Sequence, residues 1–407
     1  MNKQTVKNST LDHNLCINCG ICKICCPVDA IVMKPNKFNE PNPQINIRRC
    51  INCGVCVDNC PNTKEKMLSE AEKISAFADP STFGLENANY FLAWNPCNEE
   101  RLKSSSGGAI TKLIEFLLKN SIIDAVIHTE RLERKIGELH YGACISTTVE
   151  EVKNRTSSSY QSIDFSIIKN KIDINKTYLI TGTPCVIKGF KNYCNSKNIK
   201  YITCALICSH NVNGQFSDFF AQMHNIEINT KYFINFRNKD NIPNADNFNN
   251  HIYTNKKDLL KMNRFESNWT NIWRLYFFAL NPCCFCSDFW GYQADISVKD
   301  AWGKWSHDDP LGKSIVIIRN IKIKDYFLAC GLMEEELSYD IMKDHQRQTS
   351  DFKQKAALSK NFDCLFSKNN RTNGLLKYLF ISRMSKYLYK LFGYHLTNQF
   401  MHAIIKH

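Results

Sequence analysis

Directly after a segment rich in serine and glycine, the apolar residues of the chain follow a helical period. In the string RLKSSSGGAITKLIEFLLKN they recur at every third or fourth position, as Ile110, Leu113, Ile114, Leu117 and Leu118. This spacing predicts an amphipathic helix. Ser106, the last serine before the apolar run, is the predicted N-cap.

A different pattern appears at residues 178–185, where the apolar run YLI leads into the string TGTPC. A short apolar run that ends in a Gly-Thr-Pro turn predicts a buried strand followed by a helix. Cys185 would stand at the start of that helix, where the helix terminus stabilises a thiolate.

The segment 365–407 combines apolar and basic residues. It contains seven Lys and Arg residues but no Asp or Glu, and its apolar positions recur at helical spacing: Leu376, Leu379, Phe380, Met384, Tyr387, Leu388, Leu391 and Phe392. The pattern predicts a basic amphipathic helix. We expect its apolar stripe to pack on the rest of the chain, while docking on an anionic membrane surface or on a partner protein is the alternative.

Composition places the chain among globular proteins. The 407 residues carry 52 Lys+Arg and 39 Asp+Glu, a net charge of +13, with 43% hydrophobic and 22% charged residues. These values exclude disordered, collagen-like and coiled-coil chains. The basic residues follow no nucleic-acid-binding fold, so no nucleic-acid partner is expected. Neither a Ser-His-Asp constellation nor a carboxylate pair of a hydrolase stands out.

The chain contains 20 cysteines, which calls for an explanation. The first residues include no apolar signal segment, and no stretch approaches the ~18 apolar residues of a membrane span. We therefore expect a cytoplasmic protein. Because cytoplasmic thiols stay reduced, this cysteine density predicts metal ligation.

Eight of the cysteines form a repeat. The pattern C-x2-C-x2-C-x3-C-P occurs twice, and bacterial two-cluster ferredoxins have this spacing, with the fourth cysteine of each run crossing to the other cluster. One predicted 4Fe-4S cluster has the ligands Cys16, Cys19, Cys22 and Cys60, and the other has Cys50, Cys53, Cys56 and Cys26. Cys25 is left over, and we interpret it as a buried residue beside a cluster.

Structural zinc is the alternative for paired cysteines, because tetrahedral sulfur suits both metals. A zinc ribbon, however, needs only two cysteines per knuckle. Residues 10–66 are therefore predicted to form a small α+β ferredoxin module, which transfers single electrons.

The serine- and glycine-rich loop before the first predicted helix is a candidate phosphate site. Free amides, small hydroxyls and the positive helix terminus suit an anion such as the pyrophosphate of a flavin dinucleotide. The residues concerned are Ser104, Ser105, Ser106, Gly107 and Gly108. An ordinary helix cap is the alternative.

Further along the chain, more cysteines suggest a third four-thiolate site. The predicted ligands are Cys185, Cys208, Cys283 and Cys286, the last two forming a CxxC pair. Cys204 and Cys284 are alternative ligands. A zinc knuckle at the CxxC pair, or buried free thiols, are the competing interpretations.

The order of several short strings resembles the coenzyme F-420 hydrogenase/dehydrogenase beta-subunit family, preceded by a two-cluster ferredoxin extension. The strings are SSSGGAIT, SSSYQS, GTPC, FRNK and CCFCSDFWGYQADISVKDAWG, and the resemblance covers roughly residues 10 to 345. It implies FAD, a further 4Fe-4S cluster, and oxidation or reduction of a deazaflavin coenzyme or another conjugated substrate. Bacterial relatives of this architecture often accompany enzymes of polysaccharide biosynthesis.

Matching positions carry the expected roles. The resemblance implies that the serine-glycine loop binds the flavin phosphates, and that two further strings contribute to cofactor binding through Ser159, Tyr160, Gln161, Gly182, Thr183 and Pro184. Arg237 and Lys239 would be catalytic, stabilising an anionic reduced flavin or holding an acidic substrate. A solvated strand edge is the alternative for both. Lys299, where the family has Gly, and the loose match of CSHNVN leave the deazaflavin substrate open.

The predicted fold is α+β. It comprises the ferredoxin module at 10–66, a larger mixed α/β flavin and iron-sulfur domain at 85–345, and the helical tail at 365–407. The predicted function is that of an FAD- and iron-sulfur-dependent oxidoreductase with a small-molecule substrate and a redox partner protein or ferredoxin. The alternatives are a non-catalytic electron-transfer subunit and a scaffold whose clusters only hold the fold.

Overall fold

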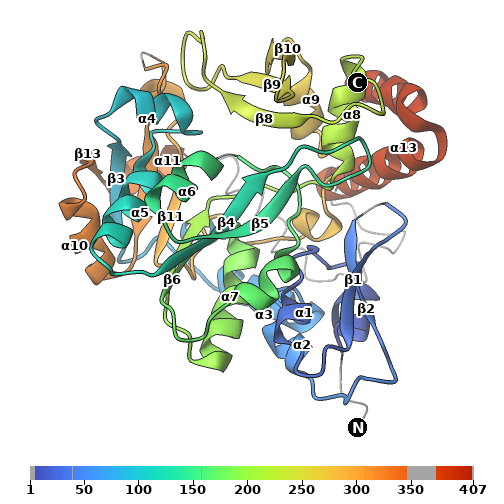
Figure 1. Ribbon diagram of the computed structural model, residues 1–407, viewed down its shortest axis with the longest axis horizontal. Helices are drawn as coiled ribbons and strands as arrows, with labels where there is room; N and C mark the ends of the chain where they lie inside the picture. Colours follow the sequence, from blue (N-terminus) through green and yellow to red (C-terminus); the bar gives the residue numbers. More distant parts are fainter. Residues whose placement is uncertain (1–4, 39, 157, 308, 346–372, 406–407) are drawn as a thin grey trace.

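The computed structural model describes residues 5–38, 40–156, 158–307, 309–345 and 373–405 (Figure 1). Its N-terminal part contains two short helices that pack together, each starting directly after a glycine in the left-handed conformation. Gly20 has φ 73° and Gly54 has φ 81°, a backbone that disfavours side chains. The elements are η1 (Lys7–Leu11), α1 (Ile21–Cys25), β1 (Ile31–Pro35), antiparallel β2 (Pro41–Ile45), α2 (Val55–Asn59) and α3 (Lys64–Ser75).

An eight-stranded sheet forms the centre of the molecule. Its strand order is β13-β3-β12-β11-β7-β6-β4-β5, and β4, β6, β7 and β11 run parallel. The strands are β3 (Asn89–Trp94), β4 (Ala125–Arg131), β5 (Tyr141–Ser146), β6 (Tyr178–Gly182), β7 (Tyr201–Leu206), β11 (Ile296–Asp300), β12 (Ser314–Ile318) and β13 (Met333–Leu337).

The direction of β3 places several predicted site strings at one edge of this sheet. β12 is antiparallel to both β11 and β3, so β3 runs in the same direction as the parallel strands. The carboxyl ends of β3, β6, β7 and β11 therefore share an edge. The serine-glycine loop, the GTPC turn, Cys208 and Asp300 all follow or end these strands, and ligands of open α/β sheets bind at such edges.

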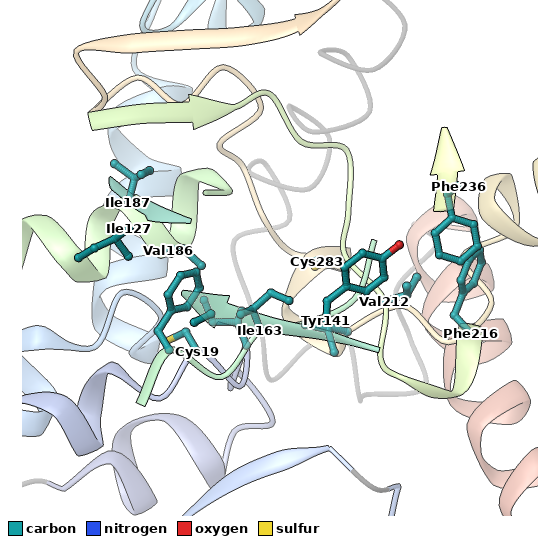
Figure 2. Close-up of a cluster of buried hydrophobic side chains, with 14 of the residues drawn as sticks. Cys19, Ile127, Tyr141, Ile163, Val186, Ile187, Val212, Phe216, Phe236 and Cys283 are labelled. Carbon is teal, nitrogen blue, oxygen red and sulfur yellow. The ribbon is translucent and has the colours of Figure 1, made fainter. Parts of the chain in front are cut away.

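Helices cover both faces of the sheet. One apolar core joins one face to α5 (Ala109–Lys119), α6 (Val149–Arg155) and α10 (Ile321–Ala329). On the opposite face, α7 (Pro184–Lys197), α8 (Gln215–Met223) and the ferredoxin module share a second core. Figure 2 shows part of this second core, including Cys19, Val186 and Cys283. The ferredoxin module is thus packed on the sheet side that carries α7.

A separate three-stranded sheet, β8 (Phe233–Asn238), β9 (Asn249–Tyr253) and β10 (Asp258–Asn263), lies beside the large one. The remaining elements connect or cap these layers: η2 (Pro80–Thr82), α4 (Asn98–Lys103), η3 (Phe165–Lys171), α9 (Trp269–Arg274), η4 (Asn281–Cys284), η5 (Gly303–Trp305), α11 (Tyr339–His345) and α13 (Asn373–Ile405). The mixed α/β architecture with a C-terminal helix agrees with the predicted fold class.

The helix predicted after the serine-glycine loop is present, but its predicted cap is wrong. α5 begins at Ala109, and Gly108 occupies the N-cap position with φ 76°. The Ser106 hydroxyl instead donates to the carbonyl of Lys313, 2.8 Å away, because the loop turns toward β12 before the helix starts. The predicted strand-turn-helix at residues 178–185 is confirmed as β6 and α7, with Pro184 at the first turn of α7.

The C-terminal helix docks on the chain as expected, but through a different face. Its inward side includes Ser382 and Ser385, whereas Phe380, Leu391 and Phe392 of the predicted stripe are more than half exposed. The Ser382 hydroxyl donates to the carbonyl of Ala279, and the amide of Phe278 donates to Ser385 Oγ. Backbone groups of a buried turn need hydrogen-bond partners, and these two serines supply them. Leu376 and Leu379 lie outside the side chains described.

Within the described ranges, the molecule has no helix that is both long and apolar enough to cross a membrane.

Candidate functional site

Four of the predicted cluster ligands surround one cavity of the ferredoxin module. The cavity measures about 370 Å³ and is lined by Cys16, Cys19, Cys22 and Cys60. The first three come from one cysteine run and Cys60 from the other, so the structure brings together the crossed set that the spacing predicts. Cys60 also lies 3.4 Å from the hydroxyl of Thr10.

The other four cysteines surround a second cavity of similar size, about 360 Å³. Its lining includes Cys26, Cys50, Cys53 and Cys56. Within the described ranges, no three His, Cys, Asp or Glu side chains are grouped as ligands of a single metal ion. The cysteines instead line two separate cavities, and both cysteine runs contribute to each cavity.

The two cavities differ in their access to solvent. Cys53 is exposed, whereas Cys19, Cys22 and Cys60 are buried. Burial raises the pKa of the Cys16 thiol to about 12 and the pKa of Cys19 well above its usual value. A bound metal displaces protons from such thiols. The cavity at Cys53 is therefore the more open of the two to solvent.

Three cysteines of the predicted third site, Cys185, Cys283 and Cys286, lie near one another. The negative charges that thiolates at Cys283 and Cys286 would carry act on Cys185, so these three lie within electrostatic range of one another. The amide of Asn211 donates to Cys283 Sγ over 3.3 Å, which joins the loop of Cys208 to the CxxC segment. Burial raises the pKa of Cys185 to about 12, so its place at the start of α7 does not outweigh desolvation.

The alternative ligands are turned away from this group. Cys204 belongs to the core on the opposite face of the sheet, among residues of α5 and α10. Cys284 is fully buried in a small cluster with Leu15 and Met67. Both positions favour a packing role.

The third cysteine group adjoins the ferredoxin module. Cys185 is among the groups that influence the pKa of Cys19, and both residues border the same core. Gly189 of α7 allows this close packing, because a Cβ there would stand 2.5 Å from Ile21 Cδ1 of α1.

A buried ion triad that the motifs did not reveal fastens the same interface. Lys188 Nζ lies 2.5 Å from Glu70 Oε2 of α3 and 3.2 Å from Asp288 Oδ2, two residues after Cys286. Burial opposes the charged form of Lys188, but the two carboxylates outweigh it and raise its pKa well above the usual value. In the sequence, the only signal for the triad is Glu70 in a helical segment, which does not reveal its distant partners.

The serine-glycine loop is held from several sides. A Cβ on Gly107 would come within 3 Å of backbone atoms of Ala93, Lys313 and Ser314, so this glycine is required by packing against β3 and β12. The amides of residues 105–108 donate to no other described residue. An anion site at this loop stays a prediction.

Arg237 and Lys239 both contact this loop. Arg237 Nη2 donates to the Ser105 carbonyl over 3.1 Å and pairs with Asp300 Oδ1 at 2.7 Å. Lys239 Nζ donates to the carbonyls of Ser106 and Leu311, at 2.8 and 2.6 Å. Burial and then the charge of Arg237 lower the pKa of Lys239 to about 7. Neither side chain lies at a solvated strand edge.

The second flavin-side string reaches the same place. Arg237 Nη1 donates to the hydroxyl of Tyr160 over 3.2 Å. On either side of Tyr160, Ser159 Oγ and Gln161 Oε1 are buried and have no hydrogen-bond partner. Buried polar atoms of this kind normally find a partner, so the absence of one here calls for an explanation. Gly182, Thr183 and Pro184 form the turn before Cys185, and the Thr183 hydroxyl lies 3.2 Å from Cys185 Sγ.

Family models match most of the chain. The model for the N-terminal part of the coenzyme F420 hydrogenase/dehydrogenase beta subunit matches residues 90–168, and the model for its C-terminal part matches residues 175–336. A 4Fe-4S dicluster domain model matches residues 15–64. Together the two beta-subunit models cover more than half of the sequence.

Among solved structures, a chain of the F420-reducing [NiFe] hydrogenase complex from Methanosarcina barkeri is similar. The alignment has 17% identity and a TM-score of 0.49, and it covers 67% of this chain and 92% of that one. No curated protein matches the sequence.

Proposed function

The chain belongs to the coenzyme F420 hydrogenase/dehydrogenase beta-subunit family and carries a 4Fe-4S dicluster domain, and on that premise we propose that it is an iron-sulfur flavoprotein oxidoreductase. It would couple one-electron transfer through its ferredoxin module to two-electron oxidation or reduction of a small or conjugated substrate through FAD. The cysteine content favours a reducing compartment, the cytoplasm.

One observation carries this proposal: an exposed cysteine group, a buried cysteine group and Cys185 of the predicted third group adjoin one another in that order. The group that includes Cys53 is exposed, the group that includes Cys19 is buried, and Cys185 of the third group adjoins Cys19. A structural scaffold has no need of such an order, whereas electron transfer between a surface partner and a buried site does. 4Fe-4S clusters at these positions would each carry one electron.

The residues at the sheet edge fit a flavin dinucleotide. The amides of residues 105–108 would hold its phosphates, and Ser159 Oγ and Gln161 Oε1 offer unpaired polar atoms. When bound, a flavin accepts two electrons together and releases them singly. Arg237 keeps the loop in place through Ser105 and adds positive charge near it.

The non-catalytic electron-transfer subunit is the second candidate. Arg237 and Lys239 both bind groups of the chain itself, which is the observation that favours it. In this case the sheet edge would bind no flavin, and the chain would pass electrons to a separate enzyme, such as one of polysaccharide biosynthesis.

Reductive titration of the anaerobic protein separates the two candidates. We expect a flavin band that bleaches together with the cluster absorbance when a low-potential dye donates electrons. Reversible cluster reduction without any flavin band would support the non-catalytic subunit and overturn the flavoprotein proposal.

The surface around Cys53 suits a redox partner. Ile47 and Ile51 are exposed there, and Arg48 and Arg49 are exposed beside them. Apolar side chains within a basic rim are complementary to a small acidic electron carrier, such as a ferredoxin.

The exposed side of α13 supports peripheral membrane binding. Leu391 and Phe392 are 63% and 61% exposed, Lys390 is exposed next to them, and Gly393 breaks the helix at this point. Apolar and basic side chains together suit an anionic lipid surface. Co-sedimentation with anionic vesicles should fall with the double variant Leu391→Glu, Phe392→Glu and stay unchanged with Ile228→Glu, an exposed residue outside the helix.

A further inference from the structure

Arg264 is a buried cation whose hydrogen-bonding capacity is not used. It follows β10, its amide donates to the carbonyl of Phe248 over 3.0 Å, and the residue is 6% exposed. Two of its guanidinium nitrogens, Nε and Nη1, have no hydrogen-bond partner. Leaving charged N–H groups buried and unpaired is costly, so the position calls for an acceptor.

The surroundings of Arg264 are aromatic and positively charged. Its guanidinium lies 5.0 Å from the ring centre of Phe248, 4.9 Å from that of Trp302 and 4.5 Å from that of Phe265. The guanidinium of Arg237 lies over two of the same rings, at 4.6 Å from Phe248 and 5.3 Å from Trp302. Two like charges therefore flank one pair of rings.

Only one of these two arginines has a counter-ion. Asp300 pairs with Arg237, and no described carboxylate pairs with Arg264. Burial, followed by the charge of Arg237, lowers the pKa of Arg264 to about 10. An arginine with this pKa is still protonated at neutral pH. The charge of Asp246 acts on it, but no ion pair with a described residue neutralises it.

The other unused polar atoms on these side chains are donors as well. Arg237 Nε and Trp302 Nε1 are buried and have no acceptor. Aromatic nitrogens of this kind and guanidinium nitrogens donate only. A group of donors without an acceptor, next to the loop at residues 105–108 that Arg237 holds, selects a ligand rich in oxygen and negative charge.

We propose that Arg264 binds an oxyanion, a phosphate or a carboxylate, together with Arg237 and Trp302. This inference rests on the proposed function, because the oxyanion belongs either to the bound flavin or to an acidic substrate of the same site. The flavin and an acidic substrate offer the same oxyanion chemistry, but flavin affinity responds in the first case and anion affinity in the second.

The test compares Arg264→Met with Lys256→Met, a control that removes an exposed cation from the turn between β9 and β10. Flavin affinity is measured by fluorescence quenching, and inorganic phosphate, pyrophosphate and glutarate are titrated calorimetrically into the flavin-loaded full chain. A charged hydrogen bond of about 1.5–3 kcal/mol corresponds to a loss of about ten- to a hundredfold in affinity. Arg264→Lys keeps the charge without the planar fork and should give an intermediate loss.

A loss of flavin affinity in Arg264→Met alone assigns the oxyanion to the flavin phosphates. Unchanged flavin affinity with weaker binding of phosphate, pyrophosphate or glutarate assigns it to a substrate. If the native chain binds no flavin but its melting temperature rises with an anion only when Arg264 is present, the proposed function fails and this inference stands. Equal binding of flavin and of all three anions by the native chain and Arg264→Met overturns it.

Discussion

The ferredoxin module and the region around the serine-glycine loop are built in opposite ways. The eight predicted cluster ligands of the module lie within residues 16–60, and two short helices with glycines before them turn these cysteines toward two cavities. The loop region draws on the ends of β3 and β11, on β8, and on residues 159–161, which the large sheet brings together. Local spacing determines one site, and tertiary packing determines the other.

Loss of a whole cluster is the largest effect that would test this comparison. Cys60→Ser should remove about four irons, from the cavity lined by the cysteines of the other run. Iron analysis and EPR of the anaerobic protein measure it. Cys25→Ser, which changes a buried thiol bonded to the carbonyl of Cys22, should leave the iron content unchanged. Equal loss of iron from both clusters would refute the crossed arrangement.

Next in size is the joint between the two regions. Lys188→Met leaves Glu70 and Asp288 buried without their cation, and breaking such a triad costs about 3–5 kcal/mol. Chemical denaturation followed by cluster absorbance should show the ferredoxin module released at lower denaturant. Lys197→Met, on the exposed end of the same helix, serves as the control. Equal midpoints for the two variants would mean that the triad does not fasten the module.

A smaller effect separates packing from ligand binding in the loop. Gly107→Ala should destabilise the protein by about 1–3 kcal/mol even without flavin, because the new methyl group meets rigid backbone of β3 and β12. Thermal unfolding of the flavin-free chain measures the loss. Gly214→Ala, where the methyl group would meet only the end of the Leu139 side chain, should change little. A stable Gly107→Ala chain that has lost flavin would instead assign the glycine to the cofactor.

Acid should affect the large sheet before the ferredoxin module. Burial, and then the charge of Arg155, lower the pKa of His128 from 6.5 to about 4. The unfolded chain then binds the extra proton between these values, so stability is complete above pH 6.5 and falls as the pH drops toward 4. At pH 5.5 the loss is about 1 kcal/mol.

All six tryptophans follow residue 85, so tryptophan fluorescence reports the large domain and cluster absorbance reports the module. His128→Gln should flatten the fluorescence-detected pH profile between pH 6.5 and 4. The exposed His402→Gln provides the comparison. An unchanged profile in His128→Gln would assign the acid sensitivity to other groups.

The sequence predicted the elements that depend on near neighbours. The apolar run at 178–180, the Pro184 helix start and the period of α5 are local patterns, and each is confirmed. The Ser106 cap was wrong because that hydroxyl donates to the carbonyl of Lys313, about two hundred residues later and directly before β12. The predicted inward face of α13 was wrong because the helix instead buries Ile381 and Met401, and because its serines bond the turn at Phe278 and Ala279.

Long-range partners explain the site residues that the motifs missed. Lys188 and Glu70 are separated by more than a hundred residues and belong to different helices, so neither stands out in its own segment. Arg264 carries no motif, and its significance depends on Phe248, Trp302 and Arg237 meeting around it. By contrast, the spacing within each cysteine run is enough to indicate cluster ligation.

The most direct test of the account is to count iron, acid-labile sulfide and flavin together in the anaerobically purified full chain. Three 4Fe-4S clusters and one FAD predict about twelve irons, about twelve sulfides and about one flavin per chain. Zinc without sulfide at the cysteine sites would contradict the electron-transfer reading outright. About eight irons and no flavin would contradict the flavoprotein and leave only the ferredoxin module.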